Sequence, residues 1–298
     1  MAHSVNAESP APTRLVTPVR TWTAALDGRR PPSFEPAGHR RVTVVAAHPD
    51  DETLGASGCL QALHRAGAEV TLVVATDGEA AYPALDAGAR RDLARARRVE
   101  LAAALRLQGL GDVAVHWLGL PDSGLHECGP ALRAALRPVL ADADAYLAPW
   151  TGDPHPDHRA AGLAAAEAAP VTAHGWAYPI WMWAWLTPDD PAVPWERARL
   201  HRLDADTLAA KQAAIAAFTS QVGTGPDGSP PVLDAAMLAH TRRPATGRRR
   251  RRARRSGTRA RTRCGGHGTT APRADGCGRA WRRRGRAENR RVRCPPAK

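Results

Sequence analysis

The sequence predicts an α/β fold: a Rossmann-like, mostly parallel sheet with helices on both faces. Short apolar runs rich in β-branched residues alternate with longer segments of helical periodicity, which is the pattern of consecutive βαβ units. The runs are continuous, as expected for parallel strands buried on both faces. Clusters of histidine and aspartate follow two of the runs, at the strand ends where sheets of this class carry their ligand sites.

The elements follow in chain order. Residues 42–47 predict the first strand, and residues 58–66 predict a helix that ends at Gly67. The same alternation predicts strands over 69–75, 113–118 and 145–149, and helices over 90–107, 130–140, 159–168 and 205–218. The helix over 90–107 is expected to pack through an apolar stripe at Leu93, Val99, Ala103 and Leu107. Trp181, Trp183 and Trp185 alternate along the chain, so a strand at this place would put all three on one face.

Composition divides the chain into three parts. Residues 1–38 are rich in Pro, Ala and Ser and predict a partly ordered N-terminal arm, and residues 39–241 form the predicted domain. Residues 242–298 hold 21 Arg and one Lys against two acidic residues, a net charge of +20. Because the whole chain carries +13, the other residues carry the difference, −7, so the high pI belongs to the tail.

The Arg-rich tail lacks Leu, Ile, Phe, Tyr and Met after Arg243, so it is expected to be disordered. One explanation is a nucleic-acid-binding arm. Another is translation out of frame, because a GC-rich gene read in the wrong frame tends to give Arg, Gly, Ala and Pro. We favour the second explanation, since residues 231–238 resemble the start of a closing element that is then lost.

The sequence also bears on the compartment. No apolar run approaches the ~20 residues of a membrane span. The first residues lack the basic and apolar regions of a signal peptide. We therefore expect a cytoplasmic protein without a membrane partner, and the sequence leaves its oligomeric state open.

Two short motifs carry the chemistry: His48-Pro49-Asp50-Asp51-Glu52 and His155-Pro156-Asp157-His158. Each follows a predicted buried strand. Imidazole and carboxylate groups in this number can hold one zinc ion and leave a position open for water. The alternative is that both motifs are solvated turns marked by their prolines. Two such motifs at the ends of two strands of one sheet favour the metal site.

The spacing suggests a role for each polar side chain. His48 and Asp51 lie three residues apart after a strand, where a tight turn can aim both at one point, and His158 is the natural third ligand. Asp50 is then free to act as general base. His155 is the candidate to stabilise an oxyanion or to protonate the leaving amine. Asp157 is expected to orient a histidine, and Glu52 to hold its loop through backbone hydrogen bonds.

With these motifs, the chain resembles the LmbE-like, PIG-L-type zinc N-deacetylase family over about residues 40–240. Further segments agree with the resemblance: Thr76-Asp77-Gly78-Glu79, Arg97 with Glu100, residues 118–122, and Lys211 with Ser220-Gln221. The resemblance implies zinc at His48, Asp51 and His158, Asp50 as the base and His155 as the electrostatic or acid catalyst. It also implies that Arg97 or Arg98, together with Asp122, contacts sugar hydroxyls.

The expected function is therefore hydrolysis of an N-acetyl or other N-acyl group on an N-acetylated amino sugar or its conjugate, with Zn²⁺ as cofactor. One alternative is an amidase that acts on a thiol-sugar conjugate through the same site. An alternative of another class is nucleic-acid binding by the tail, which would weaken steeply with salt.

Overall fold

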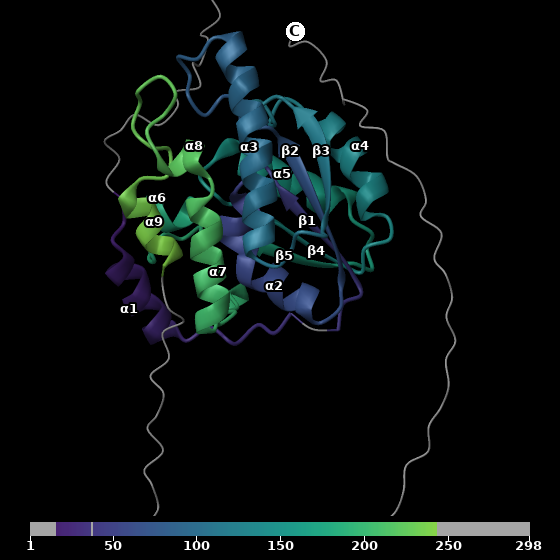
Figure 1. Cartoon of the computed structure of the whole chain (residues 1–298). Coiled ribbons are helices and arrows are strands. Elements are labelled where there is room, and N and C mark those ends of the chain that lie inside the picture. Colours follow the sequence, from purple (N-terminus) through teal and green to yellow (C-terminus); the bar gives the residue numbers. More distant parts are fainter. Residues whose placement is uncertain (1–15, 37, 243–298) are drawn as a thin grey trace, which may run out of the picture. The chain divides into compact units, whose positions relative to one another are not determined.

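The computed structural model describes residues 16–36 and 38–242, which belong to one compact unit (Figure 1). Its centre is a five-stranded, wholly parallel sheet with the order β3-β2-β1-β4-β5. The strands are β1 (Arg41–Ala46), β2 (Glu69–Thr76), β3 (Ala114–Leu120), β4 (Ala145–Pro149) and β5 (His174–Tyr178). The predicted fold class is confirmed.

The central strand β1 shows why this segment extends. Its β-branched side chains alternate between the two faces of the sheet: Val42 and Val44 belong to one apolar core, and Val45 belongs to the other. Val42 lies beside Val70 of β2 in the parallel register. Since both faces are covered, every position of the strand after Arg41 is buried.

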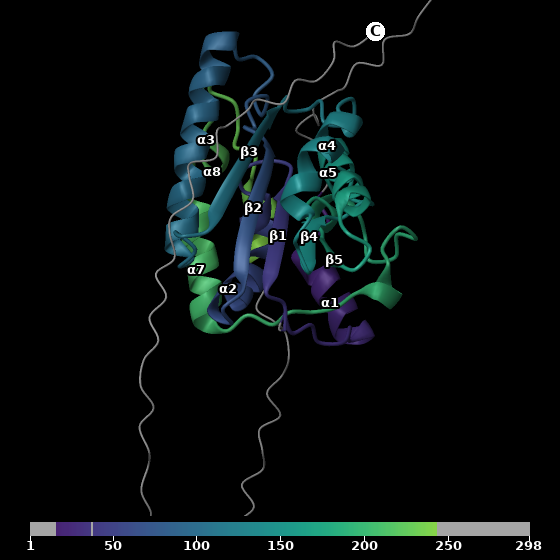
Figure 2. The same cartoon turned by 90° about the vertical axis from the view of Figure 1, so that its right-hand side faces the viewer.

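Helices cover both faces of the sheet, as Figure 2 shows with the sheet seen edge-on. One layer contains α2 (Ser57–Arg65), α3 (Ala87–Leu107), α7 (Ala205–Ala216) and α8 (Thr219–Val222). The opposite layer contains α4 (Gly129–Leu140) and α5 (Pro156–Ala168). The first layer buries Leu60 and Leu101 against the sheet, and the second buries Leu132 and Ala161. Each helical layer thus covers one face of the sheet and encloses one of the two apolar clusters.

The segment before the sheet packs against residues late in the chain. It contains α1 (Val19–Arg29), and two further short helices lie nearby, α6 (Met182–Trp185) and α9 (Ala235–Thr241). Trp22 of α1 is fully buried, and its Nε1–H donates to the Trp183 carbonyl at 2.8 Å. The Thr17 backbone N–H donates to Ala184 at 2.8 Å. Residues 1–15 of the expected arm, and the tail from residue 243, lie outside the described residues.

The alternating tryptophans do not form a strand. The last strand is residues 174–178, and Met182–Trp185 form helix α6 instead. The rings of Trp181 and Trp185 stack with centroids 4.4 Å apart, because residues four apart lie on one side of a helix. Alternation over only three tryptophans does not separate a strand from a single helical turn.

The stripe predicted for α3 is wrong in part. Leu93 is buried, but Val99 is 69% exposed and Leu107 is 50% exposed. Val99 follows Leu93 by six residues, which is about 240° around a helix, so the two cannot share a face. The buried face of α3 consists of Leu93, Arg97, Glu100, Leu101, Ala104 and Leu105, and it includes two charged residues.

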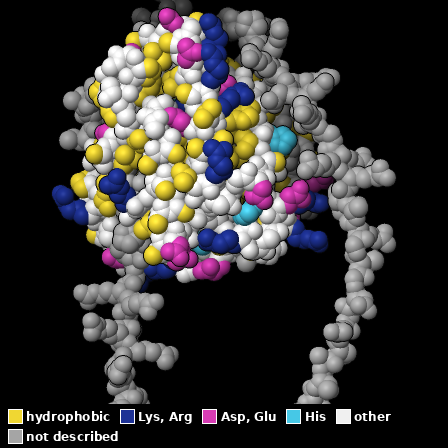
Figure 3. Space-filling model, viewed as in Figure 1, with side chains coloured by type: hydrophobic (Ala, Val, Ile, Leu, Met, Phe, Trp, Pro, Cys, Tyr) yellow, Lys and Arg dark blue, Asp and Glu magenta, His cyan; other side chains and the backbone are white. Residues whose placement is uncertain are grey.

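Figure 3 shows basic side chains that follow α3 on the outer surface. Among the described residues, no helix combines the length and apolarity that crossing a membrane requires.

Candidate metal centre

The two histidine motifs meet at the carboxyl ends of adjacent strands. The first follows β1 and the second follows β4, and β1 pairs directly with β4. His48, Asp51 and His158 are all buried, and each offers one ligand atom within 4.8 Å of the other two. Parallel pairing of two strands has therefore joined residues about 100 positions apart.

Asp51 is fixed by the backbone of the loop that carries it. Its Oδ2 accepts the N–H groups of Ala47 and His48, both at 2.9 Å. Its Oδ1 lies 3.2 Å from Nε2 of His158. Burial alone would raise the pKa of this carboxyl group, but the neighbouring His158 outweighs it, so the pKa of Asp51 lies below its ordinary value. Asp51 is thus an ionised, oriented carboxylate.

His158 presents one nitrogen to Asp51 and the other to Asp153. Its Nδ1 lies 3.1 Å from Oδ1 of Asp153, which fixes the tautomer in which Nε2 has a free lone pair. The Nε2 atom is buried and, although it lies 3.2 Å from Oδ1 of Asp51, it has no hydrogen-bond partner among the described residues. Burial lowers the pKa of His158, but the two carboxylates raise it to about 9. Surroundings that favour a proton so strongly also favour a metal cation.

His48 is oriented in the same way by two carboxylates. Its Nε2 lies 3.1 Å from Oδ1 of Asp122 and 3.3 Å from Oδ2 of Asp157. Its Nδ1 lies 3.7 Å from Asp51, on the side that faces the other candidate ligands. Despite the opposing effect of burial, Asp122 and Asp157 raise the pKa of His48 well above its usual range. A histidine whose outer nitrogen donates to a carboxylate is the usual arrangement of a metal ligand.

A second set of ligand atoms, in His48, Asp122 and Asp157, also lies within 4.8 Å. Asp51 of the first set accepts backbone hydrogen bonds only through Oδ2, whereas Asp157 accepts them through both of its oxygens. Asp157 accepts from Ser123 at 2.8 Å and from Leu125 at 3.1 Å, and Asp122 accepts from Ala80 at 2.8 Å. The first set, with two imidazoles and the unpartnered nitrogen of His158, fits a zinc-like ion better.

Asp50 lies beside the ligands in a strained backbone conformation, with φ of 144°. Its carboxylate accepts from Nη2 of Arg97 at 3.0 Å, and its backbone N–H donates to Glu52 at 3.3 Å. Burial raises the pKa of Asp50 to about 7, although Arg97 lowers it. A carboxyl group with such a pKa can both accept and release a proton near neutral pH.

His155 caps the first turn of α5. Its Nδ1 accepts from the backbone N–H of Asp157 at 3.2 Å. Its ring is stacked on His158, with centroids 4.7 Å apart, and lies 5.0 Å from His48. Burial and the two neighbouring histidines lower its pKa to about 3, so the ring is neutral. Because Nδ1 accepts, the proton is on Nε2, which makes that atom a hydrogen-bond donor.

The residues predicted to bind substrate have separate locations. Arg97 is only 3% exposed and also donates to the carbonyls of Pro49 and Gly78, at 2.8 and 3.1 Å. Arg98 instead makes a two-pronged contact with Asp77, at 2.8 and 2.9 Å, over the ring of Trp117. Arg97 and Asp122 thus adjoin the centre, and Arg98 lies in another cluster. A contact of any of them with substrate stays a prediction.

Sequence reasoning missed Asp153, which is completely buried. Besides His158, it accepts from the backbone N–H groups of Ile180 at 2.9 Å and Met182 at 3.3 Å. It therefore connects the second motif to the segment after β5. The available signal was its place in Gly152-Asp153-Pro154, directly before the motif.

The chain is similar to known proteins. Residues 43–169 match the family described as "PIG-L: GlcNAc-PI de-N-acetylase". A 1D-myo-inositol 2-acetamido-2-deoxy-alpha-D-glucopyranoside deacetylase from Streptomyces avermitilis is 32% identical over 242 residues, which cover 67% of this chain and 82% of that protein. The N,N'-diacetylchitobiose deacetylase from Pyrococcus horikoshii superposes with a TM-score of 0.49 and 24% identity, over 67% of this chain and 78% of that one.

Other relatives match over shorter stretches. An enzyme of the same name, numbered 1, from Catenulispora acidiphila is 42% identical over 98 residues, which cover 31% of this chain and 30% of the relative. The one numbered 2, from Saccharopolyspora erythraea, is matched over 32% of its length. The chain thus spans about a third of the length of these two relatives.

Proposed function

We propose, from the premise that this chain belongs to the PIG-L family, that it is a zinc-dependent hydrolase. Its substrate would be an N-acetylated amino sugar or a conjugate of one, and its products acetate and a free amine. The observation that carries the proposal is the buried set of His48, Asp51 and His158, in which the Nε2 atom of His158 has no hydrogen-bond partner.

These three residues would hold the metal. Two imidazole nitrogens and one carboxylate oxygen are a common ligand set of catalytic zinc, and it leaves a position for water. Zinc bound there would act as a Lewis acid, which lowers the pKa of water and polarises a carbonyl group. Asp153, Asp122 and Asp157 would keep the two histidines in the orientation that ligation requires.

The proton transfers fall to the chain's own side chains. The Asp50 carboxylate would take a proton from the attacking water, with Arg97 holding that carboxylate in place. The neutral His155 would donate its Nε2–H to the oxygen on which negative charge develops. Asp50 would then pass the proton that it took from water to the leaving amine as the C–N bond breaks.

The substrate class is suggested by the relatives. Several of them are named as deacetylases of an inositol-linked N-acetylglucosamine. We therefore propose a glucosamine conjugate of this kind as the first substrate to test, with free N-acetylglucosamine as the comparison.

The decisive experiment measures metal and acetate on the same samples. We expect about one zinc ion per chain, and acetate release that EDTA abolishes. His158→Ala should lose both, because it removes a ligand and leaves Asp51 without its partner. His126→Ala, at an exposed position on another loop, should lose neither. Stoichiometric zinc in His158→Ala would disprove the ligand set. Binding of the glucosamine conjugate that requires zinc but releases no acetate would disprove the reaction.

A further inference from the structure

A second concave site lies beside β5, apart from the candidate metal centre. It is a cavity of about 630 Å³ bounded by β5, by the segment before the sheet and by the loop over 193–203. This volume falls within the range of about 300–1,000 Å³ that is typical of small-molecule sites. The three candidate ligands, Asp50 and His155 do not line it.

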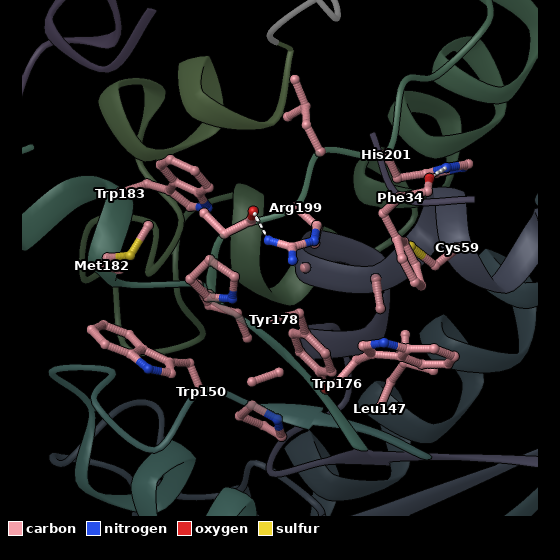
Figure 4. A pocket seen from close by; sticks show the side chains of 18 of the residues that line it. Phe34, Cys59, Leu147, Trp150, Trp176, Tyr178, Met182, Trp183, Arg199 and His201 are labelled. Atoms are coloured by element: carbon pink, nitrogen blue, oxygen red, sulfur yellow. Dashed lines mark hydrogen bonds between the residues drawn. The ribbon is translucent and has the colours of Figure 1, made fainter. Parts of the chain in front are cut away.

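Aromatic side chains form a large part of the walls of the cavity. Trp176 and Tyr178 come from β5, Trp150 from the loop after β4, and Trp183 from α6. At one end Phe34 makes an edge contact with Trp176, with ring centroids 4.8 Å apart. Figure 4 shows these rings around an open space. Such walls favour a flat, unsaturated ligand, because offset and edge contacts between rings add to the effect of buried area.

The charge of the lining is of one sign. Arg197, Arg199 and Lys211 line the cavity, and none of its described lining residues is Asp or Glu. Figure 4 shows the Arg199 guanidinium in the middle of the space, among the rings. One of its nitrogens, Nη1, donates to the Ala198 carbonyl at 2.9 Å. Arg199 is exposed and lines the cavity, and within residues 16–36 and 38–242 it makes no ion pair with a carboxylate, so its remaining donors are available to an anion.

We propose that this cavity binds an aryl carboxylate, with the aromatic body between the tryptophan rings and the carboxylate on Arg199. A guanidinium group matches a carboxylate with two parallel hydrogen bonds. A neutral aromatic molecule would leave Arg199 unused, and a cation would meet three positive groups. The combination of ring-lined walls and cationic groups therefore selects an aromatic anion, in a site separate from the proposed deacetylase centre.

The test uses 2-naphthylacetate and its neutral isostere, 2-naphthylacetamide, titrated by calorimetry into the full chain. Each titration is run without acetate and again with excess acetate, which saturates carboxylate binding at the metal centre. We expect the carboxylate to bind at least tenfold more tightly than the amide. Arg199→Gln should weaken the binding of 2-naphthylacetate alone, so that the two probes bind with similar affinity. Arg199→Lys should retain part of the preference for the carboxylate. The matched control is Arg137→Gln, an exposed change on α4 outside the cavity lining, which should alter neither affinity.

Several outcomes would overturn the proposal. Equal affinity of the carboxylate and the amide would show that charge plays no part. An unchanged affinity in Arg199→Gln would place the anion elsewhere. Loss of naphthylacetate binding when acetate is added would assign it to the metal centre, and no binding of either probe would leave the cavity without this ligand class. Because acetate release is not the readout, failure here leaves the deacetylase proposal untouched.

Discussion

At the scale of single residues, the candidate centre separates two carboxyl groups that are adjacent in sequence. Asp51 is held ionised by His158 and two backbone N–H groups, whereas burial raises the pKa of Asp50 to about 7. Neighbouring acids with different pKa values can take different roles, one as a ligand and the other as a proton acceptor. The strained φ of Asp50 is consistent with a position that is fixed for function.

Replacing Asp50 with Asn tests that division of roles. The amide cannot accept a proton from water, so we expect acetate release to fall by about 10²–10⁴-fold, the usual contribution of a general base. Zinc content should be unchanged, since Asp50 is not in the proposed ligand set. Parallel metal analysis and acetate assays would check this. Deacetylation at the normal rate in the variant would exclude Asp50 as the base.

Cys59 gives a prediction about pH. Burial raises the pKa of its thiol to about 12, although Lys211 lowers it. At pH 8 only about one thiol in 10⁴ is then ionised, against about a quarter for an unperturbed thiol. We therefore expect slow alkylation of Cys59 by iodoacetamide in the native protein, with a rate that still rises with pH at pH 10. Peptide-resolved mass spectrometry would follow it.

The urea-denatured chain is the control for Cys59, and its labelling should level off above about pH 9. Since the folded pKa is the higher one, the neutral thiol contributes to stability below the unfolded pKa, and this contribution decreases as pH rises above it. Native labelling as fast as that of the denatured chain would contradict the raised pKa.

The proposed ligands could be predicted at this scale because each motif is contiguous and directly follows a strand. Asp157 was expected to orient a histidine, but the sequence did not show which one, nor that Asp122 contacts His48 and Arg97 contacts Asp50. Arg97 reaches Asp50 across 47 positions, and Asp122 and Asp157 reach His48 across the sheet edge. Nothing local in the sequence of α3 separates an arginine that binds a buried carboxylate from one that faces the surface.

At the scale of elements, the chain after Asp51 continues as a π-helix, Glu52–Ala56, before α2 begins. The sequence predicted only the later helix, because a π-turn has no propensity signal of its own. Such turns are frequent at functional sites. Here the turn leaves Glu52 buried beside Asp50, with its Oε1 accepting from the Thr53 hydroxyl at 2.5 Å. Gly55 permits the close approach of the Tyr178 ring, where a Cβ atom would clash.

Asp153 connects two loops, and its removal should weaken metal binding. In Asp153→Ala, His158 loses the acceptor that fixes its tautomer, and the N–H groups of Ile180 and Met182 lose theirs. Loss of such a supporting carboxylate typically lowers metal affinity about 10–100-fold. Competition with a zinc chelator would measure it.

Two comparisons sharpen the Asp153 experiment. Asp142→Ala, an exposed change before β4, should leave the zinc affinity as it is. Asp153→Asn retains an oxygen acceptor and should lie between the wild type and the alanine variant. If Asp153→Ala bound zinc with full affinity, the orientation of His158 would have to come from another group.

At the scale of the whole molecule, the parallel direction of the strands followed from the alternation of β-branched runs and helical segments, whereas the strand order β3-β2-β1-β4-β5 was not predicted. Where the sequence prediction failed, the packing of distant segments decided the structure. Segment 16–36 is held by Trp22 and Thr17 against residues 182–186, contacts that span more than 150 positions. Composition alone predicted a partly ordered arm there, because the local sequence cannot show which distant surface will bury it.

The Arg-rich tail gives the last prediction. Every contact described for the candidate centre lies between Ala47 and Met182. Residues 242–298 carry a net charge of +20 and the whole chain +13, so the rest of the chain is acidic. A chain that ends at Thr241 should therefore bind zinc with the same stoichiometry as the full chain and retain any acetate release. It should also lose any affinity for DNA, which in the full chain would fall steeply between 50 and 200 mM salt. Loss of zinc or of cooperative melting on truncation would show instead that the tail completes the fold, whatever its composition.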